Sequence, residues 1–320
     1  MKIVFEHKEI MPVTRYGGTE RVLFWHMCEL TRRGHDVTLI GNKKSLVEKH
    51  GIKLIKRDDQ SWQSQIPKDT DVIHLQYNFE GELSAPIIST VHGNGKVGET
   101  FSKNCAFVSK NHAKRHGSDQ YVHNAIDLRE FPYTPREFTG LNRFMFLAKA
   151  SWSVKNLKDC VRACKESKKI LNVAGGRSLF PSRYIKNHGL VDQKQKMEIF
   201  KNSDALLFPV RWNEPFGIAI IEAMSQGLPV IGSPYGSLPE LITEETGIIC
   251  NNYDEFLSAI NGNKKFNPQK IREYVEKNFS IENYTDKYLN LYERVISGEN
   301  LNKSPLKTLG DKDPEELLHF

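Results

Sequence analysis

Short apolar runs alternate with amphipathic stretches along most of this chain. Residues 2–5 form a first apolar run, and residues 18–33 follow with apolar positions at near-helical spacing until Gly34 ends the pattern. The next apolar run, at 36–40, repeats the cycle. Such alternation is typical of βα units that build a parallel sheet, so the sequence predicts an α/β fold.

The same pattern continues through two comparable lobes. In the first lobe, further strands are expected at 53–55, 72–75, 87–91, 106–109 and 120–122. In the second lobe, strands are expected at 144–148, 170–174, 187–190, 205–208, 230–232 and 247–249, and helices at 158–166, 194–202, 216–226, 238–243 and 254–260.

A segment rich in Pro, Gly and Thr at 131–140 suits a linker between the lobes. The amphipathic stretch at 281–296 is expected to pack back across the lobes, and the charged tail after it is expected to be mobile. The predicted domains are an N-terminal lobe at 1–135, a C-terminal lobe at 136–280, a crossover helix at 281–296 and a polar tail at 297–320.

Composition narrows the functional classes. A length of 320 residues suffices for two domains that each bury a core. The net charge of +6 is spread without a long basic block, which speaks against a nucleic-acid partner. The five cysteines form no Cys-x-x-Cys pair and no metal-ligand spacing with histidine, so we expect free thiols in the cytoplasm and no metal site.

Membrane association is expected to be peripheral at most, at the inner face of the membrane. No apolar run approaches the roughly 20 residues of a spanning helix, and the N-terminus lacks the apolar stretch of a signal peptide. The basic and aromatic residues Arg15, Tyr16, Arg21 and Trp25 could serve such a contact, and ordinary cleft and surface roles are the alternative.

The segment from Glu214 to Glu222 carries the clearest chemistry. A strand is expected to turn at Asn213 and Pro215 and enter a helix, whose positive end suits a sugar diphosphate. Eight helical residues would separate the two carboxylates by about 12 Å, too far for the acid and nucleophile of a glycosidase. Both are therefore expected to hold hydroxyl groups, with helix-capping acids as the alternative. The backbone amides expected at this helix end are those of Phe216, Gly217 and Ile218.

With its neighbours, this Glu-x7-Glu pattern resembles the retaining GT-B glycosyltransferases of family 4, also called glycosyl transferases group 1. The resemblance covers most of residues 1–296. It implies two Rossmann-like βαβ domains facing a central cleft, with the acceptor on the N-terminal side, the nucleotide-sugar donor on the C-terminal side and a C-terminal helix crossing back. The motifs that carry it, besides Glu214 and Glu222, are those at 16–21, 33–38, 90–93, 124–127, 224–233 and 236–240.

The resemblance also implies roles for single residues. Glu214 would bind sugar hydroxyls, Glu222 the nucleotide ribose, and His92 would lie against the transferred sugar. Gly17 and Gly18 open the first long helix, where a loop without Cβ atoms lets backbone amides approach a phosphate or sugar. A satisfied structural histidine and a simple tight turn are the alternatives for these N-terminal residues.

Lys149 and Lys155 stand where the family usually places an Arg and a Lys against the donor phosphates. The Lys at 149 and the spacing, one residue longer than usual, depart from that pattern, so Lys155 is the safer assignment. Arg177 is expected either at the phosphate or at the surface, and the backbone near Leu190 is expected to read the base, with uracil and guanine both open. His92, Glu214 and Lys155 are the predicted catalytic residues.

The expected reaction is metal-independent and cofactor-free. A hexose-type sugar would pass from UDP, or alternatively GDP, to a glycan or lipid-linked acceptor hydroxyl with retained anomeric configuration. A catalytically idle sugar-nucleotide or glycan-binding protein is the second hypothesis. An NAD-dependent oxidoreductase rests only on the Gly-x-Gly-x-x-Gly match at 93–98, where no dinucleotide helix fits before the next strand. The Asp-x-Asp pair at 311–313 is attributed to chance.

Overall fold

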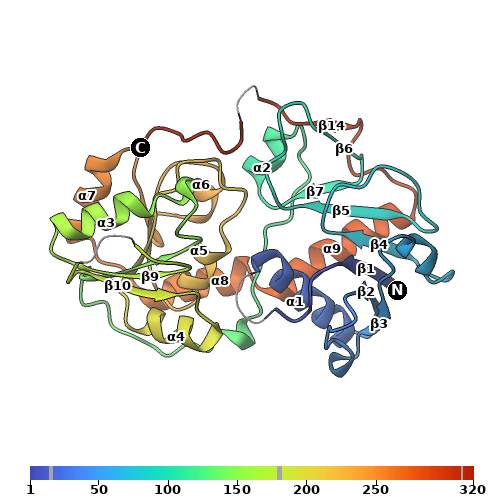
Figure 1. The fold of residues 1–320 in the computed structure, drawn as a ribbon, viewed down its shortest axis with the longest axis horizontal. Helices are drawn as coiled ribbons and strands as arrows, with labels where there is room; N and C mark the ends of the chain where they lie inside the picture. The colour runs from blue at the N-terminus through green and yellow to red at the C-terminus, as the bar shows by residue number, and fades with distance from the viewer. Residues whose placement is uncertain (14–16, 179–181, 311–312) are drawn as a thin grey trace. The chain divides into compact units, whose positions relative to one another are not determined.

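The chain forms two compact units in the computed structural model, which describes residues 1–13, 17–178, 182–310 and 313–320 (Figure 1). Unit 1 contains residues 1–13, 17–125 and 281–310, and unit 2 contains residues 126–280 and 313–320. The predicted boundary at 135 therefore lies inside unit 2. A bridge between Ile126 and Ser280 attaches the chain to unit 2 already before the predicted linker at 131–140.

Unit 1 is built on a parallel six-stranded sheet in the order β3-β2-β1-β4-β5-β7. Counted within this sheet, the order is the 3-2-1-4-5-6 of Rossmann folds. Its strands are β1 (Lys2–His7), β2 (Asp36–Gly41), β3 (Lys53–Lys56), β4 (Val72–Leu75), β5 (Ile87–Val91) and β7 (Cys105–Phe107), and its helices are α1 (Gly18–Arg32), α2 (Lys110–Arg115) and α9 (Ile281–Ile296).

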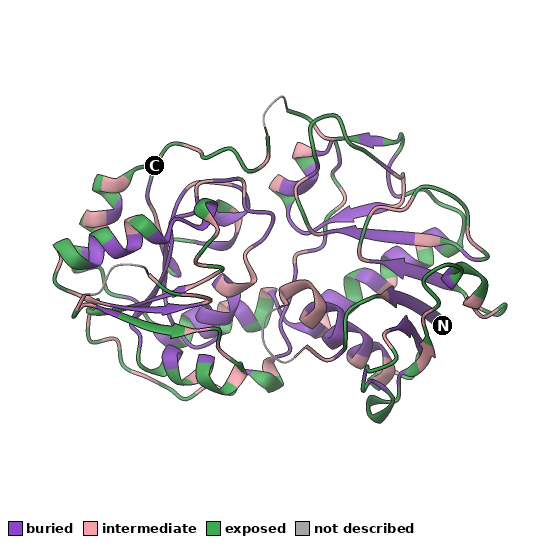
Figure 2. Cartoon of the chain, viewed as in Figure 1, coloured by how far each residue is buried: buried purple, intermediate pink, exposed green. Residues whose placement is uncertain are grey.

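Unit 2 repeats this topology with the order β10-β9-β8-β11-β12-β13. Most strands of both sheets are buried (Figure 2), as parallel strands covered on both faces are expected to be. The strands of unit 2 are β8 (Arg143–Leu147), β9 (Ile170–Ala174), β10 (Ile185–Gly189), β11 (Ala205–Phe208), β12 (Val230–Gly232) and β13 (Gly247–Ile249). The helices of unit 2 are α3 (Leu157–Glu166), α4 (Gln193–Lys201), α5 (Ile218–Met224), α6 (Leu238–Leu241), α7 (Tyr253–Asn261) and α8 (Pro268–Asn278).

The prediction of an α/β fold is confirmed, and most predicted elements agree within a few residues. The strand predicted at 120–122 is wrong, because only Tyr121 makes a single bridge, to Phe107. Helices α2 and α8 were not predicted. The Gly93–Gly98 loop leads into the short strand β6 (Thr100–Phe101) and not into a helix, which agrees with its rejection as a dinucleotide motif.

The C-terminal tail differs from the mobile segment that its polar composition suggests. In unit 1, β14 (Leu306–Lys307) pairs with β6 in antiparallel fashion. In unit 2, Leu318 donates its backbone N–H to the carbonyl of Arg211 at 2.8 Å, and the Arg211 Nε donates to the carbonyl of Leu318 at 2.7 Å. Phe320 packs edge-on against Phe256 with ring centroids 5.7 Å apart. Both parts of the tail are therefore ordered by specific contacts.

Helix α9 is joined to α1 and the sheet of unit 1 by a fully buried polar network. His26 is hydrogen-bonded to Thr285 at 3.0 Å and to the hydroxyl of Tyr292 at 2.8 Å. The same hydroxyl is 2.7 Å from Nδ1 of His74, whose Nε2 is 2.7 Å from Oγ1 of Thr90. Each imidazole nitrogen thus has a partner, which is what burial of a polar group requires.

Tyr292→Phe should lower the free energy of unfolding of unit 1 by about 2 to 6 kcal/mol. The substitution keeps the ring but leaves His26 and His74 each with an unpaired buried nitrogen, at about 1 to 3 kcal/mol each. Urea unfolding measures the change. Tyr121→Phe, at an exposed ring, is the control and should change stability by less than about 0.5 kcal/mol. Equal effects of the two substitutions would contradict a structural role for the network.

Unit 1 should lose stability as the pH falls below about 6.5. Burial lowers the pKa of His26 to about 3 and that of His92 to about 3, and it lowers the pKa of His74 and His112 well below the ordinary value. Below the unfolded value of about 6.5, the unfolded chain binds protons that the folded chain does not, so acid favours unfolding.

Thermal unfolding between pH about 7 and pH about 5 measures this loss, and the melting temperature should fall across that window. His319→Gln, at an exposed position, is the control and should leave the slope unchanged. A melting temperature that stays constant across the window would show that the buried histidines do not titrate as their surroundings imply.

Candidate functional site

The candidate site lies at the carboxyl ends of the strands of unit 2, the edge where open parallel sheets bind ligands. The loop after β8 forms a short 3-10 helix at Ser153–Lys155, and the loop after β11 contains Trp212 and Glu214. The two loops are tied together because Arg211 donates its backbone N–H to the carbonyl of Val154 at 2.7 Å. Neighbouring strands thereby deliver the predicted lysine and glutamate to one place.

Lys155 and Glu214 form a buried ion pair. The Lys155 ammonium donates to Oε2 of Glu214 at 2.5 Å, and Nε1 of Trp212 donates to the same oxygen at 2.6 Å. The exposed fractions of the two charged side chains are 10% and 8%. Removing either charge would leave the other buried without compensation. The structure thus brings two of the three predicted catalytic residues into direct contact.

Aromatic rings surround the ammonium of Lys155. Nζ lies 4.7 Å from the ring centroid of Trp212, 5.3 Å from that of Trp152 and 5.5 Å from that of Phe208, all within cation–π range. The two tryptophan rings are 4.8 Å apart at 59°. These rings were missed by the sequence analysis. The available signal was that two of the chain's four tryptophans lie within three residues of Lys155 or Glu214.

The backbone of Glu214 is held by the motif at 236–240. A Cβ added to Gly236, whose φ is +64°, would lie 2.3 Å from both the backbone N and the carbonyl O of Glu214. Ser237 donates its backbone N–H to that carbonyl at 3.0 Å, and its hydroxyl donates to the carbonyl of Phe216 at 2.7 Å. The glycine and serine therefore fix the course of the chain at Glu214.

The helix predicted at 216–226 is shorter in the structure, so the separation of the Glu214 and Glu222 carboxylates cannot be calculated from a continuous helix. Helix α5 begins at Ile218 after Gly217, which has a left-handed φ of 88°. Glu214 precedes the helix, so its separation from Glu222 does not follow from helical geometry. The Phe216 side chain is buried and packs against Phe279, while Gly217 and Ile218 are half-buried.

Glu222 lies on α5 and pairs with a lysine that the sequence analysis did not single out. The ammonium of Lys196, on α4, donates to Oε1 of Glu222. The exposed fractions of the two side chains are 6% and 8%. Nζ of Lys196 also lies 5.2 Å from the ring centroid of Phe131. Both glutamates of the Glu-x7-Glu pattern are thus neutralised by buried lysines.

The remaining predicted donor residues follow the carboxyl ends of neighbouring strands. Lys149, Arg177 and Leu190 are exposed, after β8, β9 and β10 respectively. The β9 loop turns at Gly175, whose backbone N–H donates to the carbonyl of Gly189 at 2.8 Å and whose added Cβ would lie 2.1 Å from the carbonyl of Ala148. The structure does not bring Lys149 into the Lys155–Glu214 pair.

Residues 137–278, which span nearly all of unit 2, match the family model described as glycosyl transferases group 1. This part of the chain is therefore similar to group 1 glycosyltransferases. A 68-residue segment is 43% identical to the "Uncharacterized 41.2 kDa protein in cps region" of Klebsiella pneumoniae, over 21% of this chain and 19% of that protein. The matched segments span only 19% to 56% of the curated relatives' lengths.

Comparison with solved structures shows that the chain has a GT-B fold of two domains. AviGT4, a glycosyltransferase involved in avilamycin A biosynthesis, has a TM-score of 0.73 at 18% identity, over 93% of this chain and 98% of that chain. Anabaena Alr3699/HepE in complex with UDP and glucose has a TM-score of 0.67 at 15% identity, over 92% and 99% of the two chains. At these identities the similarity establishes the fold alone.

Unit 1, outside the residues that match the family model, holds His92, Gly17 and Gly18 at the carboxyl edge of its own sheet. His92 follows β5, and its Nε2 is hydrogen-bonded to Oε1 of Gln76 at 2.8 Å. Nδ1 of His92 and Nε2 of Gln76 are both buried without a partner among the described residues. Gly17, with a φ of 140°, caps α1, and Gly18 is its first residue. Tyr16, in the same motif, lies outside the described residues.

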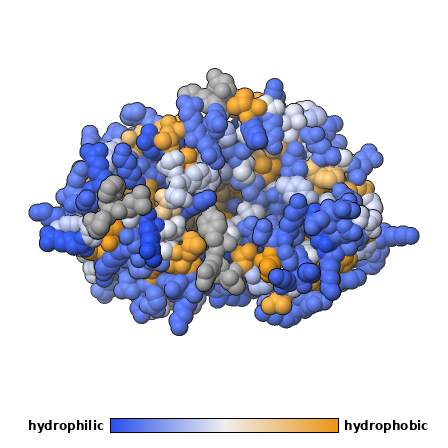
Figure 3. Space-filling view, viewed as in Figure 1, coloured by the Kyte–Doolittle hydropathy of each residue, from blue (hydrophilic) through white to orange (hydrophobic). Residues whose placement is uncertain are grey.

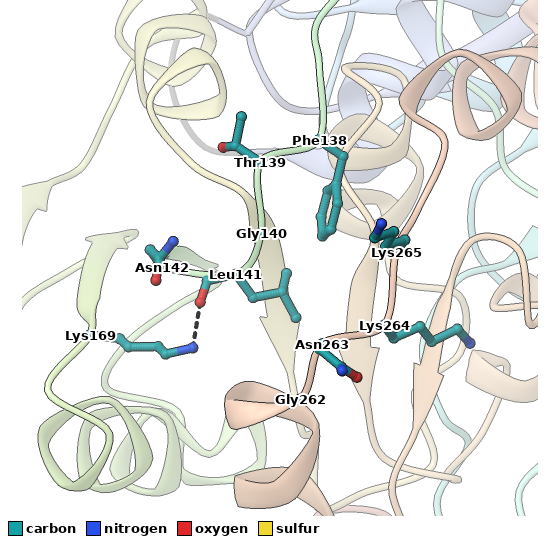
Figure 4. A pocket seen from close by; sticks show the side chains of 10 residues that line it. All are labelled: Phe138, Thr139, Gly140, Leu141, Asn142, Lys169, Gly262, Asn263, Lys264 and Lys265. Atoms are coloured by element: carbon teal, nitrogen blue, oxygen red, sulfur yellow. Dashed lines mark hydrogen bonds between the residues drawn. The ribbon is translucent and has the colours of Figure 1, made fainter.

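A cavity of about 330 Å³ in unit 2 does not coincide with the candidate site at Lys155 and Glu214 (Figure 4). It lies at the amino ends of β8 and β9, between residues 138–142 and 262–265. Lys169, which lines it, donates to the carbonyls of Leu141 and Ile260, so its ammonium is already engaged by the backbone. Neither Lys155 nor Glu214 lines this cavity.

Of the four residues considered for membrane contact, the structure describes Arg21, which is half-buried, and Trp25. Trp25 is buried in unit 1, and Arg15 and Tyr16 lie outside the described residues. On the face shown in Figure 3, apolar side chains form small patches separated by hydrophilic ones. Within the described ranges, no helix has the length and apolar character needed to cross a membrane.

The described ranges contain no group of three or more His, Cys, Asp or Glu side chains arranged to hold a metal ion. One member of the Asp-x-Asp pair, Asp311, lies outside them. All five cysteines are free thiols.

Proposed function

We propose that this protein is a retaining glycosyltransferase that transfers a hexose-type sugar from a UDP-sugar to an acceptor hydroxyl. A GDP-sugar is the alternative donor, and the acceptor is a glycan or a lipid-linked glycan in the cytoplasm or at the inner face of the membrane. The observation that carries the proposal is the buried Lys155–Glu214 pair, at the ligand-binding edge of a group 1 glycosyltransferase domain. The Rossmann-type order of the sheet is consistent with a nucleotide at this edge.

The ion pair suggests how the donor would enter. The diphosphate of the donor is a stronger partner for the Lys155 ammonium than a single carboxylate, so it would draw Nζ away from Glu214. Oε2 of Glu214, which still accepts from Trp212, would then be available to the sugar hydroxyls. The movement of the Lys155 ammonium from Glu214 to the diphosphate would thereby prepare both the phosphate site and the sugar site.

In the proposed reaction, the bond between the anomeric carbon and the phosphate oxygen breaks as the acceptor oxygen bonds to the same face of that carbon. The acceptor proton passes to the leaving diphosphate. Lys155 stabilises the negative charge that builds on this diphosphate, with Lys149 at the same edge as a second cation. His92 and the Gly17–Gly18 loop would contribute from unit 1, against the transferred sugar.

The choice of UDP is supported by a structural neighbour. HepE was solved in complex with UDP and glucose, and with UDP-glucose. In the present chain the exposed loop at Leu190, after β10, is the segment proposed to read the base. GDP is the alternative because the sequence of this loop leaves uracil and guanine both open.

The proposal is tested by a screen of UDP-sugars and GDP-sugars with the full chain in the presence of EDTA. Thermal shift reports binding, and release of the nucleoside diphosphate reports turnover. We expect one donor class to bind and to be turned over without a divalent metal. An absolute requirement for Mn²⁺ would contradict the metal-independent mechanism, and no response to any nucleotide sugar would contradict the function.

A second candidate function is a sugar-nucleotide or glycan-binding protein without turnover. It is favoured by one observation, namely that Lys155 and Glu214 neutralise each other while Lys149 is exposed where the family usually has an arginine. Binding of a donor without hydrolysis or transfer, in the same screen with a range of acceptors, would support this alternative.

A further inference from the structure

We infer that Lys196 is a positioning residue for donor binding, which pairs with the carboxylate of Glu222 and orients it toward the ribose hydroxyls of the nucleotide. This inference rests on the proposed function, because ribose binding by Glu222 is part of it. The observation is the buried contact between the Lys196 ammonium and Oε1 of Glu222, between α4 and α5 of one domain.

The environment of the pair makes a purely stabilising role a poor explanation. With exposed fractions of 6% and 8%, both charges have lost most of their hydration. Buried ion pairs of this kind are often no more stabilising than apolar side chains of similar volume, because desolvation offsets the attraction. The flat ring of Phe131, 5.2 Å from Nζ, adds a further contact that fixes the ammonium.

The helix that carries Lys196 is itself firmly placed. Asp192 and Gln195 form a capping box at the start of α4, in which each side chain accepts from the other residue's backbone N–H. Ile199 and Phe200, on the next turn, are buried. Lys196 therefore approaches Glu222 from a fixed helix, and the carboxylate is oriented from both sides of the contact.

This arrangement suits the recognition of a diol. An ionised carboxylate offers about four acceptor sites, so one ammonium contact does not exhaust it. The two adjacent hydroxyls of a ribose are donors, and hydrogen bonds to an ionised acceptor are roughly twice as strong as neutral ones. Lys196 would act through Glu222, keeping its charge in a site with little water, and would not itself touch the nucleotide.

The test compares the affinity of the full chain for UDP and for 2′-deoxy-UDP by calorimetry, with GDP and 2′-deoxy-GDP as a parallel pair. Lys196→Met should weaken UDP binding by on the order of 10- to 100-fold and bring the ratio of the two Kd values toward one. Lys196→Arg, which keeps the charge, should restore most of the ratio. Lys194→Met, exposed on the same helix, is the matched control and should change neither Kd.

A double variant separates the positioning role from direct contact and from loss of folding. In Lys196→Met/Glu222→Gln the buried pair is neutral, so the fold is not left with an uncompensated carboxylate. If Lys196 acts through Glu222, the double variant should bind UDP as Glu222→Gln does. Binding about tenfold weaker than that of Glu222→Gln would mean that Lys196 touches the ligand, and would overturn the inference.

The remaining outcomes are distinct from one another. An unchanged UDP affinity and an unchanged ribose discrimination in Lys196→Met would overturn the inference and leave the proposed function intact. A lower melting temperature with unchanged discrimination would assign the pair a structural role only, which also overturns it. If the unmodified chain binds neither UDP nor GDP, the proposed function fails and this inference fails with it.

Discussion

Glu214→Gln is expected to reduce sugar transfer by about 10²- to 10³-fold, the effect typical of losing one charged contact at a reacting centre. The substitution keeps the size of the side chain and an oxygen for Nε1 of Trp212, but it removes the negative charge that would bind sugar hydroxyls. Release of the nucleoside diphosphate in the presence of acceptor measures the loss.

The choice of glutamine follows from the structure. Glu214→Ala would remove both the charge and the oxygen to which Lys155 and Trp212 donate, whereas glutamine keeps an acceptor oxygen for both donors. Either substitution leaves the ammonium of Lys155, 10% exposed, without its counter-charge, which destabilises proteins by about 3 to 5 kcal/mol, so thermal unfolding of Glu214→Gln is measured beside its turnover. Glu244→Gln, at an exposed position of the same domain, is the control and should have wild-type turnover. Turnover by Glu214→Gln equal to that control would show that the active site lies elsewhere.

Lys155→Met is expected to lower kcat by about 10²- to 10³-fold with a smaller change in KM for the donor. A cation that stabilises a leaving diphosphate contributes most when negative charge has built up in the transition state, so its loss appears mainly in kcat. The methionine keeps the contact with the rings of Trp152 and Trp212 but carries no charge.

Steady-state kinetics of donor turnover measures this effect. Lys158→Met, at an exposed position on α3, is the matched control and should leave kcat unchanged. Lys155→Arg should retain part of the activity, because the positive charge remains in place. A kcat for Lys155→Met within about twofold of the control would move the phosphate-stabilising role to Lys149 or Arg177 at the same sheet edge.

The sequence predicted the type of fold because each βα unit has a recognisable pattern within a short stretch of residues. Apolar runs of four to five residues and amphipathic stretches are properties of neighbouring residues, and most strands were placed correctly. Helix α8 was missed because it presents few apolar positions, chiefly Ile271 and Val275, among charged residues. The false strand at 120–122 has strand-like residues, but Tyr121 forms only one bridge.

The candidate site was predicted only in part, because local motifs identify residues but not the contacts and turns that bring them together. Glu214, Glu222 and Lys155 stand in recognisable motifs, so they could be named, whereas the lengths of the turns between them could not. The left-handed backbone at Gly217 starts α5 later than the apolar pattern suggested, and this invalidated the spacing argued from a continuous helix. Trp212 was overlooked although it lies two residues from Glu214.

The sequence alone therefore determined the α/β class and the two lobes, and it gave the segment from Glu214 to Glu222 as the candidate site. Only the tertiary structure decided which charges meet, namely Lys155 with Glu214 and Lys196 with Glu222, pairs separated by 59 and 26 positions along the chain. The physical reason is that these contacts depend on which strand ends and helices lie side by side, a property of sheet order that no local pattern of residues encodes.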